Sequence, residues 1–177
     1  VTGVQTCALP IFTSIPGDTI HFLKSQHFGF ETSGDNRMDS IVFKGGELLT
    51  EIESTFEHTG FLTISSMNIL DGNRNPYSYT VQISGSTGDF TWAESLDLDG
   101  YFLGTEQQGD SSVFRMDYDL ALINSGNPVN TGDFCDINSN FLDMGFYSLF
   151  GKVDASEVVR VGGEREIGSD AVLGGVW

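Results

Sequence analysis

Apolar and polar residues alternate strictly along several short stretches of this chain, and this alternation is the feature that most constrains its fold. From residue 77 to residue 84, every odd position is tyrosine, valine or isoleucine, and every even position is serine, threonine or glutamine. From 113 to 122, large apolar residues fill the even positions, and the odd ones include one arginine and two aspartates. A period of two puts successive side chains on opposite faces of a strand. Both stretches therefore predict half-buried β-strands.

Further stretches of this kind occur along the whole chain, and clusters of Gly, Asn, Asp or Pro separate them. One such cluster is Lys44-Gly45-Gly46, which we expect to be a turn. No segment carries a convincing helical repeat. Around ten short strands with this spacing predict an all-β fold, an antiparallel two-layer β-sandwich or jelly roll. The remaining predicted strands are 19–23, 28–32, 40–44, 48–56, 60–70, 90–93, 101–103, 146–150 and 157–161.

The charge balance excludes several classes of partner. The chain has 177 residues with 25 acidic and 8 basic side chains, and its formal net charge is -17. Nucleic-acid binding needs clustered Lys and Arg, so we expect no nucleic-acid partner. No apolar run approaches the roughly 20 residues of a membrane-spanning helix, so we expect no membrane span. A hydrophobic content of 39% with 14 Phe is enough for a folded core, and the length fits one domain.

The two ends of the chain differ in character from its middle. Residues 1–11, VTGVQTCALPI, resemble the translation of a sequencing-adapter primer, and we expect them not to belong to the native protein. We expect residues 12–152 to form the β-sandwich domain. Residues 153–177, rich in Val, Gly and Glu, are expected to be a final edge strand and a C-terminal linker. Cys7 falls in the first segment, which leaves Cys135 as the one native cysteine, interpreted as a small buried hydrophobic residue.

Two acidic stretches contain the oxygen ligands that calcium prefers. Calcium takes six to eight oxygens, and a loop with Asp or Asn at alternate positions supplies them by curling round the ion. Neither stretch follows the EF-hand pattern, because Phe141 replaces the expected glycine and Tyr101 stands at the next alternate position after Asp99. The alternative is that these residues cap turns and keep an acidic surface hydrated. The predicted calcium ligands are Asp97, Asp99, Asp136, Asn138, Asn140 and Asp143.

Catalytic motifs are not recognisable in the sequence, and we expect a non-catalytic protein. His21, His27 and His58 fit no short metal or nucleophile motif. Carbohydrate binding is an alternative, since aromatic rings stack on sugar faces, and Trp92 and Tyr101 are its predicted ligand-binding residues. The competing interpretation places such rings in the core, as the strand parity of Trp92 indicates.

Three segments, residues 38–49, 61–64 and 77–81, resemble the strands of bacterial pre-peptidase C-terminal-type sandwich modules. The resemblance implies a secreted, non-catalytic jelly-roll module attached to an exported enzyme or surface protein. It would place the chain outside the cell or at the cell surface, with glycans or other surface and matrix proteins as partners. A carbohydrate-binding module and a structural subunit of a virion or filament are the two alternatives.

Overall fold

The computed structural model describes residues 15–30, 36–84, 89–109, 111–128, 130 and 132–152, together with the backbone of 2–6, 159–161 and 164–166. No helix occurs among them, and none is therefore long and apolar enough to cross a membrane. All the strand pairings are antiparallel, which confirms the all-β prediction. The strands are β1 Thr2–Thr6, β2 Thr19–Phe30, β3 Arg37–Ser54, β4 Thr59–Leu70, β5 Pro76–Ile83, β6 Phe90–Asp97, β7 Phe102–Gly104, β8 Glu106–Gln108, β9 Ser111–Ile123, β10 Cys135–Lys152, β11 Val159–Val161 and β12 Glu164–Glu166.

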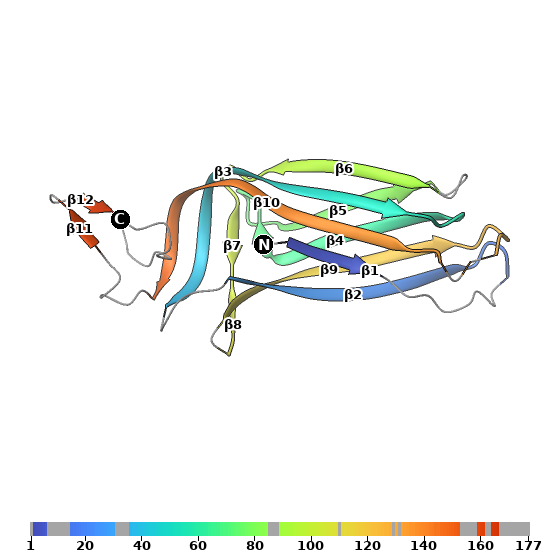
Figure 1. Ribbon diagram of the computed structural model, residues 1–177, viewed down its shortest axis with the longest axis horizontal. Coiled ribbons are helices and arrows are strands. Elements are labelled where there is room, and N and C mark those ends of the chain that lie inside the picture. The colour runs from blue at the N-terminus through green and yellow to red at the C-terminus, as the bar shows by residue number, and fades with distance from the viewer. Residues whose placement is uncertain are drawn as a thin grey trace.

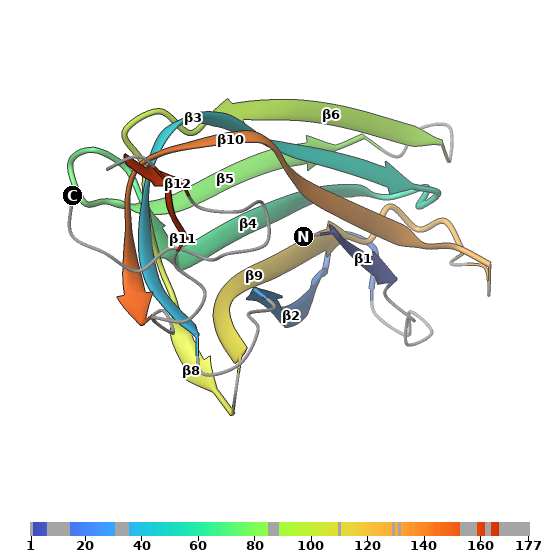
Figure 2. The same cartoon turned by 60° about the vertical axis from the view of Figure 1, so that its left-hand side comes forward.

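One sheet runs through most of the described chain and curls back on itself (Figures 1 and 2). Its strands follow the order β1-β10-β3-β7-β4-β9-β2, with β6 on β3, β5 on β4 and β8 on β9. The short strand β7 pairs with both β3 and β4 and so joins two arms. The first arm contains β6, β3, β10 and β1, and the second contains β5, β4, β9 and β2. β11 and β12 form a separate two-stranded ribbon. A β-sandwich or jelly roll in the strict sense stays a prediction.

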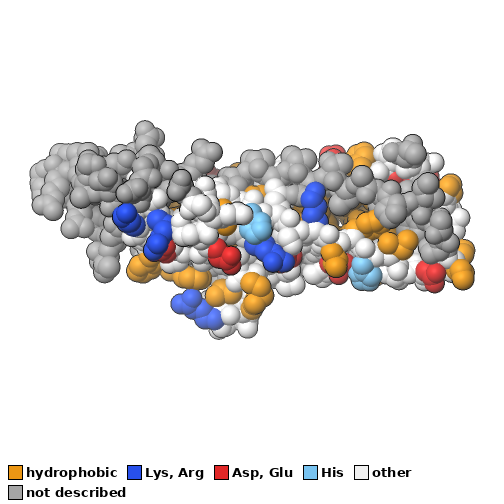
Figure 3. Space-filling model, turned by 90° about the horizontal axis from the view of Figure 1, so that it is seen from below, with side chains coloured by type: hydrophobic (Ala, Val, Ile, Leu, Met, Phe, Trp, Pro, Cys, Tyr) orange, Lys and Arg blue, Asp and Glu red, His pale blue; other side chains and the backbone are white. Residues whose placement is uncertain are grey.

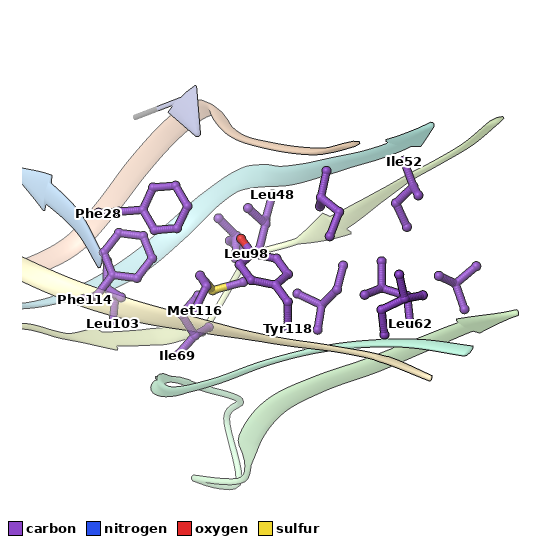
Figure 4. Close-up of a cluster of buried hydrophobic side chains, with 14 of the residues drawn as sticks. Phe28, Leu48, Ile52, Leu62, Ile69, Leu98, Leu103, Phe114, Met116 and Tyr118 are labelled. Carbon is purple, nitrogen blue, oxygen red and sulfur yellow. The ribbon is translucent and has the colours of Figure 1, made fainter. Parts of the chain in front are cut away.

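The core lies between the inner faces of the arms (Figure 4). The alternation predicted for 113–122 holds, because the even positions Phe114 to Leu122 are all buried. Leu48 and Ile52 of β3 meet Leu62 of β4 in the same cluster. Cys135 is 1% exposed and belongs to this core, as predicted. Each arm therefore has one buried face and one solvent-exposed face.

Two of the predicted breaks between strands are wrong. Residues 19–30 form one strand, β2, and β3 passes without a break through the Gly45-Gly46 pair that we expected to turn. These glycines have φ values of +144° and +109° and lie beside an irregularity in β10 between Leu142 and Gly145. A bulge of this kind bends a strand without ending it. The β3–β10 ribbon therefore bends where the sequence predicted a turn.

Part of the N-terminal segment pairs with the sheet. β1 lies antiparallel to Asp136–Asn140 of β10, with Val4 opposite Asn138. Such pairing uses main-chain groups and makes no demand on the side chains. The origin of residues 1–11 stays a prediction, and residues 7–11 lie outside the described part of the chain.

Candidate functional site

The structure does not gather the predicted calcium ligands. Asp136, Asn138 and Asn140 lie on β10, so the expectation that they form a curling loop is wrong. At about 3.3 Å per residue, Asp136 and Asn140 are about 13 Å apart along the strand. Oxygens bound to one calcium each lie about 2.3–2.6 Å from the ion. A straight strand cannot bring these three side chains to one ion together.

The other predicted ligands lie elsewhere on the same arm. Asp97 ends β6 opposite Glu47, and its Oδ1 accepts a hydrogen bond of 3.0 Å from the backbone N–H of Asp99. Asp136 lies opposite Glu53, six residues further along β3, or about 20 Å away. Asp143 is exposed in the irregular part of β10. Within the described residues there is no group of three or more His, Cys, Asp or Glu placed to hold a metal.

One detail near these residues concerns two oxygens on β10. The Oδ1 atoms of Asp136 and Asn138 are buried and make no hydrogen bond with the described chain. Their neighbours on β3, Glu53 and Glu51, are carboxylates. Only a weak contact of 3.4 Å joins the Asn138 Nδ2 to Glu51. Buried acceptors in this state destabilise a fold unless something donates to them or coordinates them.

The predicted aromatic ligand residues are partly buried and pack against the core. Trp92 of β6 stacks on Tyr79 of β5, with ring centroids 5.4 Å apart and an interplanar angle of 25°. A hydrogen bond to Glu94 raises the pKa of Tyr79. The Tyr79–Trp92 contact joins the free sides of β5 and β6 through side chains. It also covers one face of each ring, which is then closed to a sugar. Tyr101 packs on the core in the turn before β7.

The structure instead brings polar groups together on the outer face of β2, β9 and β4, where it leaves a hollow of about 340 Å³. Figure 3 views the molecule from the side of β2 and shows acidic, basic, histidine and apolar side chains on this face. The hollow contains two carboxylates, two cations, hydroxyls and one exposed leucine. Its lining residues are Leu23, Lys24, Ser25, Thr63, Ser65, Arg115, Asp117, Tyr118 and Asp119.

Asp117 is the most strongly bonded group of this hollow. Its Oδ1 accepts hydrogen bonds from Ser25 Oγ at 2.5 Å and from Arg115 Nε at 2.7 Å. Burial raises the pKa of Asp117, but the bonds from Ser25 and Arg115 and the charges of Arg115 and His27 outweigh it, and the pKa falls below its ordinary value. This carboxylate is therefore ionised at neutral pH and held in one orientation.

Asp119 lies two residues after Asp117 on β9 and contacts a histidine of β2. Its Oδ1 is 2.9 Å from His21 Nδ1, and both side chains are about half exposed. Thr63 of β4 lies opposite Thr80 of β5, and their hydroxyl oxygens are 2.9 Å apart. Leu23 lies opposite Asp119 in the register and projects into solvent. Acceptors, donors and one apolar side chain thus lie side by side on β2, β9 and β4.

Sequence analysis missed this hollow because its parts come from separate strands. The sequence shows polar residues at odd positions of 113–122, but it shows them only as one face of a single strand. The register places Leu23 beside Asp119 and Ser25 beside Asp117, across 96 and 92 positions of sequence. Polar residues at the odd positions of both strands, among them His21 and Ser25 on β2 and Asp117 on β9, were the available signal.

A serine–histidine pair, in which only the histidine is buried, lies at the far end of the sheet and has a structural explanation. His58 Nδ1 is 3.0 Å from Ser125 Oγ and also accepts the Ser125 backbone N–H at 3.2 Å. Ser125 Oγ in turn donates to the Glu57 carbonyl at 3.0 Å. The pair ties the β3–β4 turn to the loop after β9. Burial lowers the pKa of His58, against the opposing charges of Asp133 and Glu57, so the ring is neutral near pH 7.

Neither the protein-family models nor the curated proteins give a match to this chain.

Proposed function

We propose that this chain is a non-catalytic β-sandwich module of an exported bacterial protein, acting outside the cell or at its surface, and that it binds carbohydrate in the hollow on β2, β9 and β4. The observation that carries the proposal is the set of oriented carboxylates beside an arginine, hydroxyls and a leucine on three paired strands. Groups held by paired strands need little further ordering when a ligand binds. The two facing arms and their shared core support the sandwich part of the proposal.

The chemistry of the hollow suits a ring that carries several hydroxyls. Asp117 and Asp119 both make their intramolecular contacts through Oδ1, so the Oδ2 of each can accept a ligand hydroxyl. Arg115 and Ser65 supply donors. Leu23 offers an apolar surface to the C–H face of a sugar. Because positive and negative groups balance here, a neutral ligand fits better than a highly charged one.

Glycan-array screening of the full chain followed by calorimetry tests this proposal. Ser65→Tyr fills the hollow without removing a charge and should abolish binding of any glycan that the wild-type chain retains. The control is Ser95→Tyr, on the outer face of β6 in the other arm, which should bind normally. If no glycan is retained, or if Ser65→Tyr binds as well as wild type, carbohydrate binding in this hollow is wrong. Binding to a surface or matrix protein, or a structural role in a virion or filament, would then take its place.

Calcium stabilisation is a second part of the proposal, supported by the two unpaired oxygens of Asp136 and Asn138. A cation coordinated by both would remove their unfavourable burial. At about 100 times its Kd, calcium would add about 2.7 kcal/mol of stability, or roughly 5–10 °C in Tm for a domain of this size. Melting curves with calcium and with chelator, at constant ionic strength, measure this directly. Equal Tm values, or a shift that survives Asp136→Ala, would remove calcium from the proposal.

A further inference from the structure

Large apolar side chains crowd the second half of β10. Their exposed fractions lie between 37% and 60%. The described chain has nine exposed large hydrophobic side chains, and five of them fall within the nine positions 142–150. Soluble monomers rarely leave apolar groups together in this way. We call these five the apolar strip: Leu142, Met144, Phe146, Tyr147 and Phe150.

The apolar strip surrounds an open edge of the sheet. β3 pairs with β10 from Cys135 to Lys152, whereas β1 pairs only with Asp136–Asn140. Beyond Asn140, β10 has a strand on one side only within the described part of the chain. Phe146 reaches the core side of this edge, where its ring centroid is 6.0 Å from that of Phe43. An exposed apolar edge is where a second polypeptide associates most readily.

The distribution of charge around the apolar strip indicates which kind of polypeptide fits against it. Residues 141–152 contain one acid, Asp143, and one base, Lys152, so the stretch is neutral in a chain whose net charge is -17. On the neighbouring strand β3, Glu47, Glu51 and Glu53 are all exposed. Two copies repel each other wherever such acids meet, but not where one apolar strip faces another. A two-fold axis brings identical surfaces together in this way.

We propose that two copies of this chain associate through the apolar strip around a two-fold axis. The contact is made by side chains and not by extending the sheet. The β10 register shifts between Leu142 and Gly145 and again between Phe146 and Ser148, and Asp143 has a φ of +48°. Such irregularities interrupt the main-chain ladder that an added strand would need. Tyr147 and Phe150, as exposed aromatic rings, are the expected anchors of the interface.

Sedimentation velocity on the full chain, over a wide concentration range and at low and high salt, tests the proposal. We expect a monomer–dimer equilibrium that tightens as salt screens the repulsion between acidic molecules. Tyr147→Asp and Phe150→Asp should each weaken dimerisation by at least about tenfold. Met67→Asp, at an exposed position of β4 on the other arm, should dimerise as wild type does.

Three results would overturn the proposal. The first is a wild-type chain that stays monomeric at every concentration and salt. The second is a dimer that survives both strip substitutions, which would place the interface elsewhere. The third is a monomer that binds phospholipid vesicles through Tyr147 and Phe150, which would make the strip a lipid-binding surface. Because the strip lies on the first arm, failure of dimerisation leaves the glycan test on β2, β9 and β4 unaffected.

Discussion

Replacing Gly46 by alanine adds a single methyl group, and it should be among the most destabilising of such small substitutions in this protein. Gly46 has a φ of +109°, and a Cβ there would lie 2.9 Å from Met144 Cα and 3.0 Å from the Leu142 carbonyl oxygen. Both are backbone atoms of the β10 bulge, which cannot rotate away as a side chain does. Backbone strain destabilises the folded state by about 1–3 kcal/mol, and overpacking adds a loss of similar size. The unfolded chain of the alanine variant is stiffer, which offsets about 0.4–1 kcal/mol of this loss. A loss of about 3 kcal/mol lowers Tm by about 6–12 °C.

Gly45→Ala is the matched control for this prediction. Gly45 has a φ of +144°, but a Cβ there would have nothing within 4 Å. Its substitution therefore carries the conformational strain without the collision. Thermal and urea unfolding, followed by far-UV circular dichroism, should show Gly46→Ala clearly less stable than Gly45→Ala. Equal losses would mean that β10 yields to the added methyl group, and the argument that the Gly46–bulge contact fixes the bend would be wrong.

Two further predictions concern the core and the dependence of stability on pH. Leu62 is fully buried and Leu23 is 77% exposed, so Leu62→Ala should cost about 2–5 kcal/mol and Leu23→Ala less than about 0.5 kcal/mol in urea unfolding. Similar losses at both positions would contradict the assignment of inner and outer faces. Since burial lowers the pKa of His58, the unfolded state binds the extra proton, and stability should fall as the pH drops below about 6.5. His58→Gln should flatten that part of the profile, and an unchanged profile would assign the pH dependence to other groups.

The fold could be predicted from the sequence wherever one face of a strand is buried. The even positions of 113–122 and the odd positions of 77–83 had to be inward because only those are large and apolar, and the structure confirms both parities. Strand lengths could not be predicted in the same way. Gly45 and Gly46 favour a turn by their local preferences, and only the pairing of β3 with a bulged β10 shows that the strand continues. A bulge belongs to two strands, so neither sequence alone reveals it.

Similar reasoning explains why the calcium prediction and the hollow came out differently. Asp and Asn at alternate positions fit a calcium loop and the outer face of a strand equally well, since both leave every second side chain polar. What separates the two is whether the intervening residues are buried. Cys135, Ile137 and Ser139 are all buried, so the pattern belonged to a strand. Applied to β9, the same test marks Asp117 and Asp119 as an outer face, and a pairing partner with Ser25 and His21 at matching parity gathers polar groups on the face that we propose binds carbohydrate. Parity thus tells which side chains can reach a ligand, whereas register tells which of them can reach it together.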